Sequence, residues 1–165
     1  MTNPDLTLLR ARFPAEDIEW RIGQAGKSRQ GKLWATVFPY ITARAVQDRL
    51  DEVVGPGNWK IEFRAFQVGE KTGVLAGLSI KLGDEWVTKW DGAEPTATEP
   101  FKGGLSDAVK RAAAVWGIGR YLYSMPVCWA DINDNGQHRA SAKIRTDQGE
   151  ERVSFKWDPP ELPGR

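Results

Sequence analysis

The sequence contains very few of the residues that form disulfides or bind zinc. Its 165 residues include one cysteine, Cys128, and one histidine, His138. A single cysteine excludes a disulfide within the chain, and one cysteine with one histidine falls short of the four ligands of a structural zinc site. We therefore expect neither a bound metal nor another cofactor.

The sequence also lacks a strong charge of either sign and a long apolar run. It carries 23 basic and 22 acidic side chains, a net charge of +1. A strongly basic domain would indicate nucleic-acid binding by charge alone, so such a site must here come from local clustering of cations. No stretch approaches the roughly 20 apolar residues of a membrane span, and the first residues lack the pattern of a secretory signal. We expect a cytoplasmic protein without a membrane partner.

Tryptophan, by contrast, is abundant, with eight residues in the chain. Tryptophan fills cores and interfaces, and it also stacks on unpaired bases. We assign most of the eight to the core or to contacts between subunits. A chain of this length buries one sizeable core, so we predict a single domain over residues 1–157. The proline-rich residues 158–165 are expected to form a disordered tail.

The apolar pattern predicts an α+β fold in which an antiparallel meander packs on two longer helices. Alternation of apolar and polar residues predicts strands over residues 17–24, 33–38, 59–65, 74–82 and 85–90. Helical periodicity and cap signals predict helices over residues 4–13, over residues 42–54, and from Ser106 and Asp107 onward. After Asp131 the chain is polar, with one weak strand candidate over residues 152–157.

The most informative segment covers residues 101–126. Lys110 and Arg111 lie on the polar side of its helix, where they place two positive charges on a packed element. Arg forks across phosphate oxygens and Lys supplies a point charge, although a solvated surface is the commoner explanation of such a pair taken alone. The face expected to be buried carries Leu105, Val109, Ala112 and Trp116.

Two ordered blocks of sequence resemble the Rad52 type of single-strand annealing proteins. Residues 106–112 (SDAVKRA), followed by residues 116–123 (WGIGRYLY), are similar to the central motif of that family. Residues 40–44 (YITAR), followed by residues 49–59 (RLDEVVGPGNW), resemble the helix and turn that open its core. The resemblance implies a β-β-β-α core and a ring of identical subunits.

The resemblance also implies a function without enzymatic activity. Single-stranded DNA, including 3′ ends, would lie in a groove around the ring, ready for annealing in recombinational repair on the nucleoid, with other recombination proteins as further partners. The absence of a phosphate-binding loop motif agrees with annealing that needs no ATP. Two alternatives stay open, a ring-shaped scaffold that recruits repair proteins and a metal-dependent nuclease. The nuclease would use Asp91, Glu94 and Glu99, which lack the pattern of common nucleases.

The resemblance places Lys110 and Arg111 in the groove that grips the DNA backbone. It also implies a groove cation near the start of the other helix, where Arg44 lies one position before the arginine of the relatives. Pairing with Asp48, four residues on, is the alternative role of Arg44. A third groove cation of the family is replaced by Ala114, so we expect a less basic groove.

Further candidates come from the residues themselves. Lys102 precedes two glycines at a helix start, where backbone N–H groups bind phosphate, although a tight packing turn explains the glycines as well. Arg29 and Lys32, with Lys27, form a basic hairpin tip. These cations either extend the DNA-binding surface or are ordinary surface charges. Trp86 and Trp90, with Trp59 nearby, have two possible roles. They form a platform on which bases stack, or, as we favour, they belong to the core or a subunit interface.

Overall fold

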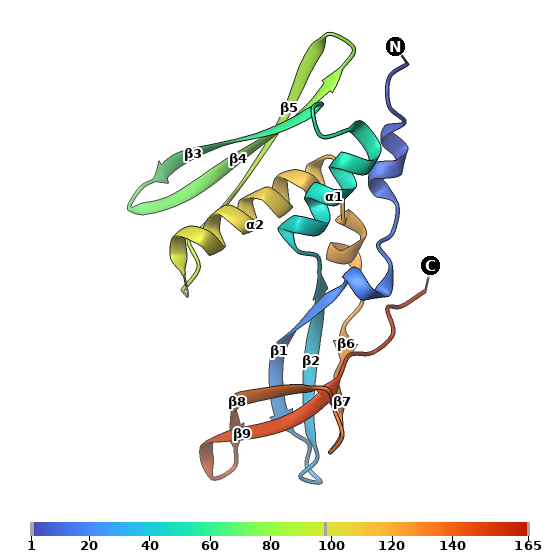
Figure 1. Ribbon diagram of the computed structural model, residues 1–165. Helices are drawn as coiled ribbons and strands as arrows, with labels where there is room; N and C mark the ends of the chain where they lie inside the picture. Colours follow the sequence, from blue (N-terminus) through green and yellow to red (C-terminus); the bar gives the residue numbers. More distant parts are fainter. Residues whose placement is uncertain (1, 98, 165) are drawn as a thin grey trace. The chain divides into compact units, whose positions relative to one another are not determined.

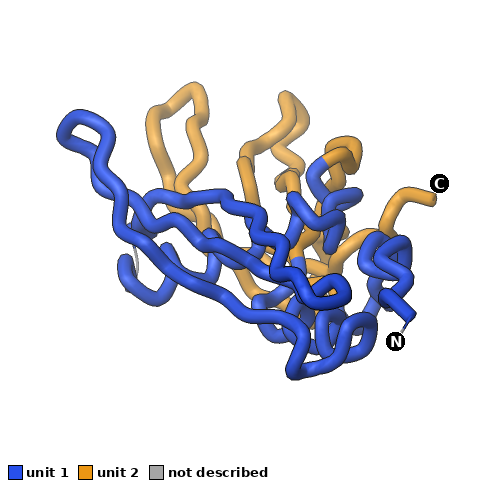
Figure 2. The backbone as a smooth tube through the Cα atoms, turned by 90° about the horizontal axis from the view of Figure 1, so that it is seen from above, with its two compact units in different colours: residues 1–17, 41–123 blue, residues 18–40, 124–165 orange. Residues whose placement is uncertain are grey.

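The structure is a computed structural model that describes residues 2–97 and 99–164 (Figure 1). The chain forms two compact units, each built from segments that are distant in sequence (Figure 2). The first unit contains residues 1–17 and 41–123, and the second contains residues 18–40 and 124–165. Among the helices of the described residues, none is long and apolar enough to cross a bilayer. A single domain with a disordered tail stays a prediction.

The first unit combines an antiparallel sheet with two α-helices, which confirms the predicted α+β class and meander. The strands β3 (Trp59–Val68), β4 (Lys71–Leu82) and β5 (Glu85–Ala93) pair in that order. Helix α2 (Pro100–Val115) packs on β4 and β5, and α1 (Ala43–Val54) contacts α2 and β3. Short 3₁₀ helices complete the unit: η1 (Leu6–Arg10), η2 (Ala15–Asp17) and most of η3 (Arg120–Ser124).

The two faces of this sheet differ because successive side chains of a strand point to opposite sides. Ala76, Leu78 and Ile80 of the central strand share one face and are at most 1% exposed. Trp116, just beyond α2, donates its indole N–H to the Leu78 carbonyl at 2.9 Å. We call this side the helix-covered face (Figure 1). The opposite side, which includes Gly77 and Ser79, is called the open face.

Helix α2 begins six residues before the predicted cap at Ser106, so that prediction is wrong. Pro100 occupies the first turn, where its missing N–H costs nothing. The sequence predicts a tight turn at Gly103 and Gly104, because glycine is a poor helix former. An added Cβ at Gly103 would lie 2.0 Å from the Thr96 hydroxyl oxygen, so the glycine is required by close packing of the preceding loop on the helix.

The second unit consists of two three-stranded antiparallel sheets around a small core. The core contains Ala35, Val37, Cys128, Phe155 and Trp157. Burial raises the pKa of the Cys128 thiol, which is a mark of an inert packing residue. One sheet has the order β1 (Glu19–Lys27), β2 (Leu33–Tyr40), β6 (Cys128–Trp129), and its β1–β2 hairpin confirms a prediction. The other has the order β7 (Asp131–Ile132), β9 (Gly149–Asp158), β8 (His138–Thr146).

The hairpin of β8 and β9 corrects the prediction of one weak strand over residues 152–157. Exposed and less exposed residues alternate along both strands. The half-buried positions of β8, however, include Ala140 and Ala142, which contribute little to an apolar pattern. Gly149, with a φ of 110°, turns the chain into β9, a conformation that glycine adopts without strain. Beyond β9, the described residues 159–164 form neither helix nor strand.

The N-terminal segment also differs from its prediction, which was a helix over residues 4–13. Only the 3₁₀ turn η1 forms, and its carbonyl groups bind a side chain instead of continuing a helix. Arg49 of α1, which is 8% exposed, donates through Nη1 to the carbonyls of Leu8, Leu9 and Ala11 at 3.4, 3.3 and 2.7 Å. Its guanidinium also lies 4.1 Å from the centre of the Phe13 ring. Arg49 therefore fastens the N-terminal segment to α1.

Replacing Arg49 with methionine tests this fastening. We expect Arg49→Met to lower the free energy of unfolding by about 2–4 kcal/mol, because each buried acceptor left without a donor costs about 1–3 kcal/mol. Urea denaturation followed by circular dichroism measures the change. Arg44→Met, on an exposed position of the same helix, is the matched control and should shift stability by less than about 0.5 kcal/mol. Equal effects of the two variants would contradict the role of Arg49.

Candidate nucleic-acid interface

Helix α2 presents Lys110 and Arg111 on its solvent side, opposite the packed Val109, Ala112 and Trp116. Lys110 is partly buried and its Nζ lies 3.5 Å from the Asp107 carboxylate, one helical turn earlier. Arg111 is exposed, and its Nε lies 3.3 Å from Oδ1 of Asp91 on β5. Both cations thus stand on a rigid element, and each has a carboxylate beside it.

Asp91 fixes one edge of the Arg111 guanidinium. Its Oδ1 accepts from the Gly92 backbone N–H at 2.7 Å and from the Arg111 Nε–H. Within the described residues, the two terminal nitrogens of Arg111 have no further hydrogen-bond partner. A guanidinium held through Nε–H leaves the edge formed by its two terminal nitrogens available for a two-pronged contact with phosphate.

The three carboxylates considered for a nuclease site serve three different cations. Asp91 pairs with Arg111, Glu94 lies 3.4 Å from Lys71, and Glu99 lies 3.4 Å from Lys102. Among the described residues, no group of three or more His, Cys, Asp or Glu side chains is placed to hold a metal ion.

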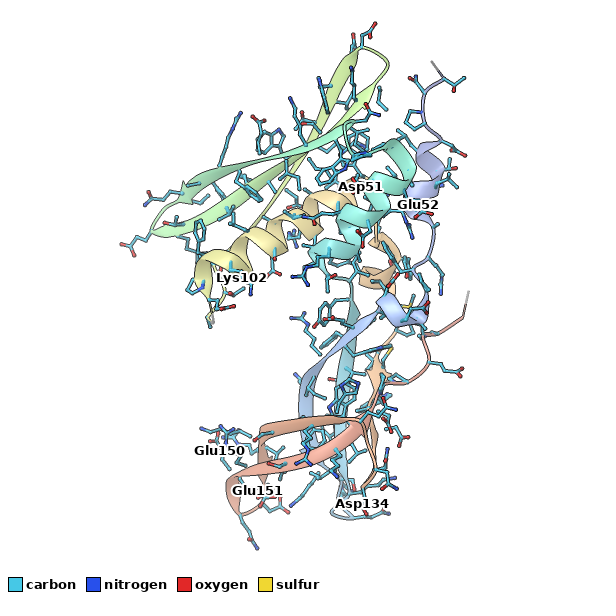
Figure 3. All side chains as sticks on the ribbon, viewed as in Figure 1. Asp51, Glu52, Lys102, Asp134, Glu150 and Glu151 are labelled. Carbon is cyan, nitrogen blue, oxygen red and sulfur yellow. The ribbon has the colours of Figure 1, made fainter. Side chains whose placement is uncertain are left out.

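Lys102 lies in the first turn of α2, where Figure 3 marks it, and its side chain is 78% exposed. The glycines that follow it are explained by packing, since Gly104 is buried and Gly103 meets Thr96. Arg44 is exposed in the first turn of α1. Within the described part of the chain, no ion pair joins Arg44 to Asp48, so no contact supports the alternative role of Arg44. Their roles in DNA binding stay predictions.

The remaining candidate DNA-binding cations lie in the second unit, at the tip of the β1–β2 hairpin. Lys27 forms an ion pair with Glu151, which Figure 3 marks on β9. Arg29 and Lys32 are exposed in the turn. The first unit thus carries Lys110, Arg111, Arg44 and Lys102, and the second carries Arg29 and Lys32.

Sequence reasoning missed the carboxylate beside each α2 cation. The i,i+3 spacing of Asp107 and Lys110 was a usable signal. The contact between Asp91 and Arg111 gave no signal, because it depends on how α2 lies on the sheet. The strand register also corrects one placement: Trp59 lies on the helix-covered face, whereas Trp86 and Trp90 lie on the open face.

With this fold and site described, comparison with known proteins identifies the class. Residues 6–141 match the Rad52/22 family of double-strand break repair proteins, and the chain belongs to this family. This match confirms the resemblance found in the two sequence blocks.

Two relatives give a closer comparison. The chain is 39% identical over 128 residues to a protein of Deinococcus radiodurans named single-stranded DNA-binding protein DdrA. It is 38% identical over 128 residues to the protein of the same name from Deinococcus deserti. These alignments cover 76% of this chain but only 58% and 60% of the two relatives, so the chain spans about three fifths of their length.

Proposed function

We propose that this protein binds single-stranded DNA through Lys110 and Arg111 and, as a ring of subunits, anneals complementary strands without ATP. Protection of 3′ ends in recombinational repair would use the same surface. The observation that carries the proposal is the Lys110–Arg111 pair on a packed helix, in a chain whose relatives are named single-stranded DNA-binding proteins.

The proposed binding step is an exchange of anions. A phosphate replaces Asp107 beside Lys110, and the forked terminal nitrogens of Arg111 bind a phosphate while Asp91 stays on Nε. Because each contact displaces or shares a carboxylate, one subunit holds DNA weakly. Weak contacts on the backbone leave base edges available, and pairing with a complementary strand then drives annealing. No step requires a nucleotide or a metal.

Assembly into a ring would turn a small cationic strip into a continuous one. A subunit with a net charge of +1 attracts DNA poorly, whereas repetition adds one Lys110–Arg111 pair for each copy. The first unit also exposes apolar side chains that a subunit contact would cover, such as Phe101, which is 78% exposed. The second candidate, a scaffold that mainly recruits repair proteins, is favoured by the balanced charge and by the pairing of the α2 cations.

The pairing rate of complementary strands tests the proposal. Two dye-labelled complementary oligonucleotides should pair faster with the protein than alone, in EDTA and without nucleotide. The expected acceleration follows from strands held by the backbone with their bases exposed. Single-strand binding without acceleration would favour the scaffold, and strand shortening that requires Mg²⁺ would favour the nuclease.

The Asp91–Arg111 contact gives a second test. When Asp91 is removed, the change in charge and the loss of the positioning hydrogen bond predict opposite changes in affinity. Asp91→Ala adds positive charge, yet we expect about 2- to 10-fold weaker single-strand binding, because a positioning hydrogen bond contributes about 0.5–1.5 kcal/mol. Asp91→Asn keeps an acceptor for Nε and should retain affinity. Asp84→Ala, in the exposed β4–β5 turn, adds the same charge and should not weaken binding. Fluorescence anisotropy measures all three, and tighter binding by both alanine variants would contradict the positioning role.

A further inference from the structure

The open face of the β3-β4-β5 sheet carries an ordered set of aromatic and basic side chains. No α-helix of the first unit lies on it, because α2 contacts the sheet through Leu78 and Asp91 of the helix-covered face. Strand register places one row of side chains from each strand here. These are Lys60, Glu62, Arg64, Phe66 and Val68 of β3, Lys71, Gly73, Leu75, Gly77, Ser79 and Lys81 of β4, and Trp86, Thr88, Trp90 and Gly92 of β5.

The Trp90 and Phe66 rings on this face lie over glycines of the central strand. A Cβ added at Gly77 would be 2.6 Å from the Trp90 ring, so the indole covers the backbone of the central strand. A Cβ at Gly73 would be 2.6 Å from the Phe66 ring. Ser79 is fully buried on this helix-free side and shares a 2.7 Å hydrogen bond with Thr88. Small residues in the central strand thus make room for aromatic rings close to its backbone.

Each tryptophan on this face has a cation over its ring. Lys60 Nζ lies 4.6 Å from the centre of the Trp86 ring, and Arg64 Cζ lies 4.6 Å from that of Trp90. Strands β3 and β5 run parallel, since both are antiparallel to β4. The cation–aromatic pair therefore repeats after four residues, a separation of roughly 13 Å along the strands. The repeat is an extended track rather than a single pocket.

We infer that this face is a second contact surface for single-stranded nucleic acid, one that holds bases by stacking. Trp86, 40% exposed, offers its ring to a base once Lys60 turns to a phosphate. Arg64 is a planar guanidinium already stacked on Trp90, and its outer side is a further platform for a base. The inference rests on the proposed single-strand binding. It adds a surface that contacts bases, whereas Lys110 and Arg111 contact the backbone.

The charge of the face favours nucleic acid over a second copy of the chain. Its cations Lys60, Arg64, Lys71 and Lys81 outnumber the carboxylates beside them, which are Glu62 and, next to Lys71, Glu94. The buried centre of a protein–protein interface is depleted in charged residues, and a copy that docked the same face here would place like charges opposite each other. Phosphates neutralise the cations while bases cover the rings, so a single strand satisfies both features at once.

An abasic strand separates stacking from phosphate binding. We compare oligothymidylate with an abasic sugar–phosphate strand of the same length. Trp86→Leu should weaken binding of oligothymidylate about 5-fold or more, the lower range for loss of one stacked base, and leave the abasic strand unchanged. Trp86→Phe, which keeps a ring, should lose less. Phe63→Leu, a 45% exposed aromatic on the helix-covered face of the same sheet, is the matched control and should bind both strands normally.

The remaining outcomes decide against the inference. Equal weakening on both strands, together with an altered mass in light scattering, would show that the face joins copies of the chain. Unchanged binding of both strands by Trp86→Leu would overturn the stacking surface while leaving the proposed function intact. A wild-type protein that binds neither strand would overturn the proposed function itself.

A measurement on the wild-type protein covers the case in which Trp86→Leu fails to fold. A photoreactive thiothymidine strand should crosslink to the peptide that contains residues 85–93. Crosslinks confined to peptides of α1 and α2 would overturn the inference without any substitution.

Discussion

The packing of α2 on the central strand of the first unit's sheet is the contact on which the candidate site depends. Trp116 closes this contact through its hydrogen bond to the Leu78 carbonyl, and the absent side chain of Gly103 lets the preceding loop reach the helix. Once α2 is fixed, Lys110 and Arg111 have a defined spacing and direction. The same packing leaves the other side of the sheet without a helix. One constraint therefore creates both surfaces proposed to contact DNA.

The electrostatics of the site bears on how a chain with almost no net charge would bind DNA, as proposed. Lys110 and Arg111 are accompanied by Asp107 and Asp91, so their charges are nearly balanced before DNA arrives. Half-buried or exposed ion pairs at the surface contribute little to stability, typically below about 1 kcal/mol, and can be exchanged for phosphate at small cost. In the proposed ring, affinity would then come from repetition of weak contacts. Weak contacts would suit the proposed annealing, in which the paired strands must be released.

Much of the fold was predictable because its strands follow simple patterns. The meander of β3, β4 and β5 alternates regularly, and α1 has a cap at Thr42 and a stop at Gly55, where φ is 89°. The early start of α2 was hidden, because close packing at Gly103 overrode the low helix propensity of glycine. Strand β8 was hidden as well, because two of its half-buried positions are alanines.

Other features depend on tertiary structure and had no local signal. The 3₁₀ turn η1 replaces a helix because Arg49, distant in sequence, binds its carbonyls. The strand register places Trp59 and Trp86 on opposite faces of the sheet, and no local pattern indicates this. The cations of the candidate site could be predicted from the sequence. The contact of Asp91 with Arg111 could not, because it depends on the packing of α2 on β5.

The most direct test of the central claim is a salt series of single-strand binding for the double variant Lys110→Ala with Arg111→Ala. The proposal predicts a large drop in affinity with unchanged assembly. It also predicts a weaker salt dependence, whose logarithmic slope falls by about 0.7 for each phosphate that the variant no longer neutralises. A double variant that binds single strands with the affinity and salt slope of the wild type would contradict the proposal.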